Sequence, residues 1–126
     1  MKLNEVISSH HEQGKIYFRR LVMELTKRLP PQLMFRVQPN KDAWHLRAEG
    51  FMPYISAKSS ESHPYRVDVD YGEKHPIMSI TAHFPTGDVA FRKKLQEAIK
   101  ASNLEKFEGS QSIDNGFFTA MFTFTK

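Results

Sequence analysis

Hydrophobic residues recur at intervals of three and four along the first part of the chain, which is the spacing of a helix with one apolar side. The residues on this stripe are Leu3, Ile7, His10, Gly14, Phe18, Leu21, Leu25 and Leu29. Pro30 and Pro31 end the helix, because a proline disfavours the helical conformation of the residue before it. Gly14 costs about 1 kcal/mol relative to alanine in a helix. It predicts a kink, two shorter helices, or a close approach of another backbone.

Between residues 33 and 84 the hydrophobic period falls from about 3.6 to about 2 residues, which indicates strands. The clearest alternation covers 65–71, and similar patterns cover 44–49 and 77–84. Met34–Gln38 is a shorter candidate strand. We expect Gly50 to separate the 44–49 strand from another strand at Phe51–Ala57. Five strands are therefore predicted between the first helix and the second.

A second helix is predicted after Thr86 or Asp88, either of which is a suitable N-cap. Its apolar stripe is Phe91, Leu95, Ala98 and Ile99. We expect it to end at Ser102-Asn103, where Asn103 tolerates the left-handed conformation. The final segment predicts a hairpin of two strands, 104–112 and 117–125, around a turn at Asp114-Asn115-Gly116.

The order of these elements predicts one α+β domain over residues 1–126. We expect a two-layer sandwich with two helices packed on one face of a mainly antiparallel sheet, in the order α-β-β-β-β-β-α-β-β. No repeat, low-complexity tract or long linker divides the chain. The alternating strands leave the second face of the sheet to solvent or to a partner.

Composition excludes several classes of protein. The chain has 126 residues, 18 Lys and Arg, 14 Asp and Glu, and no cysteine. Without cysteine there is no disulfide, thiolate nucleophile or cysteine-ligated metal centre. No apolar run approaches the roughly 18 residues of a membrane-spanning helix, and Met1–Leu3 leads into polar residues rather than a signal-peptide core. We therefore expect a cytoplasmic protein that does not enter a membrane.

Known catalytic motifs are missing from the sequence. The six glycines form neither of the two phosphate-binding patterns, and there is no G-x-S-x-G or H-E-x-x-H motif. No acidic residue stands two positions before a lysine, as a metal-dependent nuclease of the restriction type requires. These absences favour a protein that is not an enzyme and uses no cofactor and no metal ion.

Asp68 and Asp70 are the strongest candidates for chemistry. They lie two residues apart on a predicted strand and so project from one face. Glu73, in the following turn, completes a possible Mg²⁺ or Mn²⁺ site, and a metal-dependent enzyme using these three residues is one alternative. The favoured interpretation is a solvated strand face paired with Arg66 or a cation of a neighbouring strand, because hard cations need more oxygen ligands.

Positive charge is concentrated in residues 15–47. The basic residues there are Lys15, Arg19, Arg20, Lys27, Arg28, Arg36, Lys41 and Arg47, and the acidic ones are Glu24 and Asp42. Such a segment predicts a basic surface for nucleic acid or for an acidic protein, unless it is an evenly solvated helix. The aromatic residues that could stack on single-stranded bases are Trp44, Tyr54, Tyr65 and Phe117.

We therefore interpret the chain as a non-enzymatic interaction protein, such as an inhibitor, immunity protein or adaptor. It is expected to bind another macromolecule, a protein above all, through the sheet face and the basic segment. A few aromatic or arginine anchors carry most of the energy of such an interface, and we expect them to be Arg36, Trp44, Arg47 and Tyr54. A partner that itself handles nucleic acid is compatible with this interpretation. Direct nucleic-acid binding is the main alternative, and a homodimer through the sheet face or an edge strand is also compatible.

Overall fold

The computed structural model describes residues 3–39, 43–53, 62–72, 77–114 and 117–124. The elements follow each other as α1 (Leu3–Arg28), β1 (Met34–Pro39), β2 (Ala43–Met52), β3 (His63–Gly72), β4 (Ile77–His83), α2 (Val89–Ala101), the 3₁₀ turn η1 (Leu104–Lys106), β5 (Glu108–Asp114) and β6 (Phe117–Thr123).

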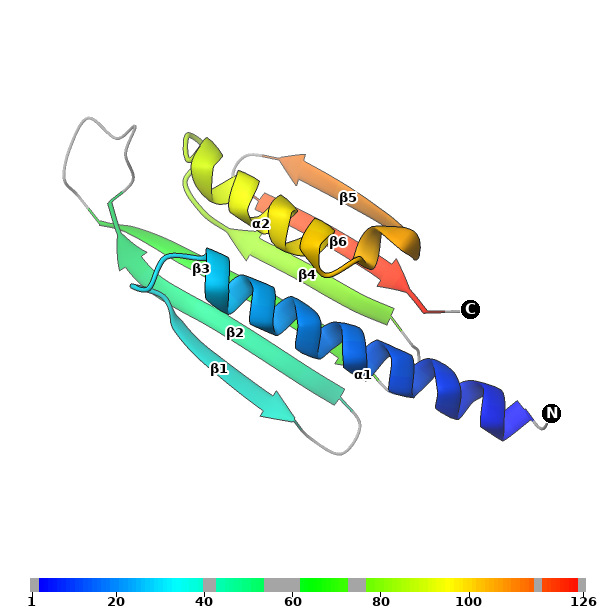
Figure 1. Ribbon diagram of the computed structural model, residues 1–126. Coiled ribbons are helices and arrows are strands. Elements are labelled where there is room, and N and C mark those ends of the chain that lie inside the picture. The colour runs from blue at the N-terminus through cyan, green and yellow to red at the C-terminus, as the bar shows by residue number, and fades with distance from the viewer. Residues whose placement is uncertain (1–2, 40–42, 54–61, 73–76, 115–116, 125–126) are drawn as a thin grey trace.

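The strands form one six-stranded sheet in the order β1-β2-β3-β4-β6-β5, and every neighbouring pair is antiparallel. Both helices cover the same face of this sheet, with α1 beside α2 (Figure 1). The predicted fold class is confirmed: a two-layer α+β arrangement with two helices on one face of an antiparallel sheet. Neither helix, among the described residues, has the length and apolar character needed to cross a membrane.

Among the residues that the structure describes, four strands precede α2, whereas five were expected. Gly50 does not end a strand, because β2 runs through it from Ala43 to Met52. A Cβ at Gly50 would lie 2.9 Å from the carbonyl oxygen of Gln32, so the glycine allows the segment before β1 to approach β2 closely. Residues 54–57 of the predicted extra strand lie outside the described residues. The observed order is α-β-β-β-β-α-β-β.

Gly14 lies inside one continuous helix, not between two shorter ones. The close approach that it permits is to a side chain: a Cβ at Gly14 would lie 2.2 Å from Cζ of Tyr71 in β3. Tyr71 is fully buried, so the missing side chain of Gly14 lets α1 lie directly on this ring.

The caps of α2 follow the sequence prediction. Asp88 is the N-cap, and its side chain accepts a hydrogen bond of 3.0 Å from the backbone N–H of Phe91. Asn103 adopts the left-handed conformation with φ 64°. The chain then forms η1, so β5 begins at Glu108 and not at Leu104 as the predicted hairpin had it. Residues 115–116 of the predicted turn lie outside the described residues.

The hydrophobic core lies between the helices and the sheet. From the helices it takes the apolar stripes that the sequence predicts, including Phe18, Leu21, Phe91 and Leu95. From the strands it takes alternate residues, of which the largest fully buried ones are Leu46, Tyr65, Tyr71, Met78, Ile80 and Phe118. Because side chains alternate along a strand, the remaining residues of each strand project from the opposite face.

Candidate functional site

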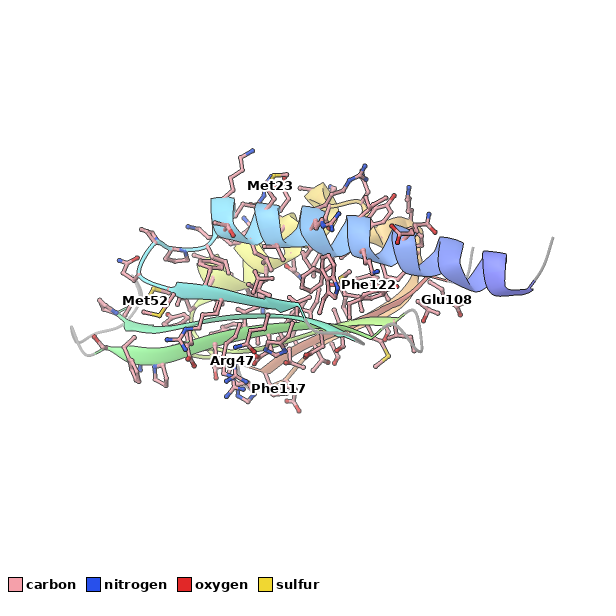
Figure 2. All side chains as sticks on the ribbon, turned by 90° about the horizontal axis from the view of Figure 1, so that it is seen from below. Met23, Arg47, Met52, Glu108, Phe117 and Phe122 are labelled. Carbon is pink, nitrogen blue, oxygen red and sulfur yellow. The ribbon has the colours of Figure 1, made fainter. Side chains whose placement is uncertain are left out.

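The sheet face opposite the helices, here called the open face, is covered by no other described segment. Figure 2 shows Arg47 and Phe117 projecting from it, while Phe122 points toward the helices. The register aligns its side chains in rows across the strands. One row contains Arg36, Arg47, Asp68, Thr81, Thr119 and Ser112, and the next contains Gln38, His45, Asp70, Ser79, Met121 and Ser110.

Asp68 is the centre of an ionic network on the open face. Its Oδ1 accepts a hydrogen bond of 2.9 Å from Nε of Arg47, and its Oδ2 accepts one of 2.7 Å from Nε of Arg66. Asp68 is only 8% exposed, although it lies on the uncovered face. The two guanidinium groups therefore both neutralise this carboxylate and shield it from water.

His45 joins this network to Asp70. Its Nε2 lies 3.1 Å from Oδ1 of Asp68, and its Nδ1 contacts Oδ1 of Asp70. Ionised carboxylates only accept hydrogen bonds, so both ring nitrogens donate at once only when the imidazole carries two protons. In that state His45 bridges the two carboxylates.

The environment of Asp68 sets its ionisation. Burial raises the pKa of Asp68, but the hydrogen bonds from Arg47 and Arg66 and their positive charges outweigh burial and hold the pKa below its usual value. The hydrogen bond with Asp68 also raises the pKa of Arg47. Asp68 and Arg47 are consequently a charged, mutually paired carboxylate and guanidinium at neutral pH.

These contacts bear on the metal-site alternative. Asp68 and Asp70 share a face as predicted, and Asp68 pairs with Arg66 and with a cation of the neighbouring strand, as the favoured interpretation has it. Glu73 lies outside the described residues. Within the described part of the chain, no group of three or more His, Asp or Glu side chains is arranged to hold a metal ion. The geometry of Asp68 is that of an ion pair with arginine.

Large apolar side chains are exposed at the end of the open face where β2 leads into β3. Phe51 is 72% exposed, Met34 58% and Phe117 38%. The ring of Phe117 meets that of His83 edge to face, with 4.4 Å between ring centroids. We call Met34, Phe51, Pro64, His83 and Phe117 the apolar end of the open face.

Two shallow depressions adjoin at the apolar end, and Pro64 lines both. One, of about 390 Å³, is lined by Met34, Arg36, Glu49, Gly50, Phe51, Pro64, Tyr65 and Arg66. The other, of about 480 Å³, is lined by His63, Pro64, His83, Phe84, Pro85, Asp114 and Phe117. The sequence pattern does not predict that Met34 and Phe51 lie at the surface. Their exposure follows from the pairing of Met34 with Glu49 and of Phe51 with Pro64, which places both on the open face.

Two of the four expected anchor residues lie together. Arg36 and Arg47 are directly opposite each other on the open face. Trp44 is on the other face, where its ring packs edge to face against Phe18 at 5.6 Å and the guanidinium of Arg19 lies 4.8 Å above it. Trp44 therefore does not share the surface of the two arginines. Tyr54 lies outside the described residues.

The aromatic residues proposed for base stacking do not form one surface. Tyr65 is 1% exposed and belongs to the core, and Trp44 is half-buried under α1. Phe117 is exposed on the open face. Among the described members of that set, Phe117 is the one whose ring a partner can reach readily.

The basic segment 15–47 is divided between the two faces of the molecule. Its α1 cations lie in the helical layer, whereas Arg36 and Arg47 lie on the open face. The helical layer gains further cations from α2, so that α1 and α2 together contain nine Lys and Arg against four Asp and Glu. The strands contain three arginines against five acidic residues. The positive charge thus belongs to the helices and not to one continuous segment.

No protein-family model, curated protein or solved structure matches this chain, so the arrangement of its own residues carries the functional argument.

Proposed function

We propose that this chain is a non-enzymatic interaction protein that binds another protein through the open face of its sheet. The observation that carries the proposal is the apolar end of that face, where Met34, Phe51 and Phe117 are exposed beside two adjoining depressions. Clustered exposed apolar side chains rimmed by polar groups are typical of protein-binding surfaces.

The charges of the open face favour a protein partner over a nucleic acid. The part formed by β1, β2 and β3 carries three arginines, Arg36, Arg47 and Arg66, and three carboxylates, Glu49, Asp68 and Asp70. Two of those arginines already pair with Asp68. Nucleic-acid binding requires an excess of cations facing the phosphates, and the described residues of these three strands provide none.

Protein interfaces usually have a few apolar anchor residues surrounded by polar residues, and the open face has the same arrangement. Phe51 and Phe117 are the expected anchors. Arg36 lies beside Met34 and pairs with no carboxylate among the described residues, so its guanidinium is available to an acidic group of the partner. The Asp68 network holds the neighbouring strands in a fixed, fully paired arrangement around them.

Affinity capture from the native host's lysate, with and without nuclease, tests the proposal. The open-face variant carries Phe51→Ser and Phe117→Ser, and the matched control carries Met23→Ser and Val89→Ser, two exposed changes in the helical layer. We expect a stoichiometric protein that survives nuclease, binds the wild type and the control, and is lost by the open-face variant. Equal retention by the open-face variant, or recovery of nuclease-sensitive material alone, would contradict the proposal.

One observation favours a second candidate, direct binding of nucleic acid by the helical layer. Lys27, Lys93 and Lys100 are exposed there and pair with no carboxylate among the described residues. This candidate predicts binding to a generic duplex or single strand that weakens steeply as salt rises, because counterions are released from the phosphates. Reversing Lys93 and Lys100 to glutamate would abolish that binding, whereas Arg36→Glu on the open face would leave most of it.

A further inference from the structure

The outer edge of β5 is an unpaired sheet edge. β5 is the last strand in the sheet order, and within the described residues it pairs only with β6. All seven of its residues are exposed. Figure 1 shows β5 at the rim of the sheet beyond β6. One side of its backbone therefore presents free N–H and C=O groups, which is the arrangement that accepts an additional strand.

The two edges of the sheet differ in how they resist such pairing. The edge strand β1 has Arg36 near its middle and Pro39 at its end, and both charge and proline are devices that block strand addition. The middle of β5, residues 109–113, has neither a charged residue nor a proline. Of the two edges, β5 is the one whose sequence permits another strand.

The charges at the ends of β5 indicate which residues an added strand would carry. Glu108 and Asp114 stand at its two ends on the open-face side, and Glu105 precedes it in η1. None of the three forms an ion pair with a cation among the described residues. Opposite charges directly across a strand pair stabilise it, whereas like charges destabilise it.

Pairing between two copies of β5 is disfavoured by the same charges. In an antiparallel pair centred on Gln111, Glu108 of each copy would stand opposite Asp114 of the other. Both ends of the pair would then bring two carboxylates together. The favoured occupant is therefore a segment of another protein with basic residues six positions apart.

Gly109 favours a large apolar residue in the added strand, on the side of the sheet that faces the helices. It lies beside a depression of about 280 Å³ lined by Glu105, Phe107, Gly109, Ser110, Gln111 and Phe122. A Cβ at Gly109 would lie 2.5 Å from Cδ1 of Phe122, so the Phe122 ring lies over the glycine. A large apolar residue opposite Gly109 on an added strand would enter the depression beside this ring. Aromatic residues across from a strand glycine are known to stabilise such pairs.

We propose that β5 binds an extended basic segment of a partner protein as a seventh, antiparallel strand. Lysine or arginine of the partner faces Glu108 and Asp114, small hydroxyl side chains face Ser110 and Ser112, and an aromatic residue faces Gly109. Asp114, at one end of this edge, adjoins the apolar end of the open face through Phe117. The unpaired backbone of β5 and Glu108 at its other end carry the inference without the function proposed above.

Synthetic peptides test this pairing on the intact chain. The probe is Lys-Val-Thr-Gln-Thr-Phe-Lys with blocked ends, which supplies the expected residues in antiparallel register. One comparison peptide has glutamate in place of both lysines, and another has N-methyl groups on alternate amides, which removes backbone donors. Binding is measured by titration in two-dimensional NMR, following the backbone amides of β5 and β6.

We expect the lysine peptide to shift the amides of β5, with the glutamate peptide binding at least roughly tenfold more weakly and the N-methylated peptide not at all. Glu108→Gln with Asp114→Asn should weaken the lysine peptide roughly three- to tenfold. Glu12→Gln with Glu97→Gln, the same charge change on the helices, should leave its affinity unchanged. Unshifted β5 amides, equal binding of any comparison peptide, or a dimer of the chain formed through β5 would overturn the proposal.

Discussion

Replacing Gly14 with alanine tests how α1 is seated on the sheet. In a solvent-exposed helix this change stabilises, by about 1 kcal/mol, because alanine has the higher helix propensity. Here the added Cβ would lie 2.2 Å from both Cζ and Oη of Tyr71, whereas ordinary contact begins at 3.4 Å. The helix and the ring must therefore separate by about 1.2 Å, the difference between those two distances.

Tyr71 has little room to yield. It is fully buried, and Phe124 packs against it edge to face with ring centroids 5.9 Å apart. Overpacking of a well-packed core costs about 1–3 kcal/mol, and we expect the upper part of that range because a whole ring must move. After subtraction of the helix-propensity gain, Gly14→Ala should lower the free energy of unfolding by about 1–2 kcal/mol.

Urea unfolding followed by circular dichroism measures this free energy. The matched control is the same change in a Tyr71→Leu background, where the shorter side chain removes the contact. There Gly14→Ala should be neutral or stabilising, so the double-mutant cycle isolates the contact. If Gly14→Ala stabilises the otherwise wild-type chain, the seating of α1 on Tyr71 described above is wrong.

Three further predictions concern stability. Asp88→Ala should cost about 1–2 kcal/mol in urea unfolding because α2 loses its N-cap, while Asp88→Asn should cost less. The lowered pKa of Asp68 contributes stability that is present above its unfolded value of about 3.9 and lost as the pH falls through the folded value. The difference in unfolding free energy between wild type and Asp68→Asn should therefore shrink as the pH falls below about 4; a difference that stays unchanged there would contradict this. Trp44→Ala should lower the free energy of unfolding by about 2 kcal/mol or more, and Arg36→Ala should lower it by less than about 0.5 kcal/mol. If the two substitutions lower it by similar amounts, Trp44 is not part of the packing under α1.

The layer arrangement was predictable because it depends on local patterns. Alternation along 65–71 and 77–84 predicted two central strands, and the prolines after Leu29 predicted the end of α1. The prediction that a strand ends at Gly50 was wrong, because a glycine inside a strand pattern is found both where a strand ends and where another segment packs closely against the strand. The contact with Gln32 that explains it comes from a distant turn and leaves no local signal.

The site was only partly predictable. The two-residue spacing of Asp68 and Asp70 placed them on one face, and the same alternation puts Trp44 with Leu46 on the helix side of the sheet, away from Arg36 and Arg47. The pairing of Asp68 with Arg47 depends on the register between β2 and β3. The grouping of cations from α1 and α2 depends on which helices lie side by side. Neither can be read from spacing along one segment.

Methionine side chains offer the most direct test of the open face as a protein-binding surface. Met34 and Met121 are exposed on that face, and Met23 is exposed on the helical layer, where Figure 2 shows it on the far side from the sheet. With ¹³C-methyl methionine, adding the captured partner should shift the NMR signals of Met34 and Met121 and leave that of Met23 in place. A shift of Met23 alone would contradict the account and assign binding to the helices.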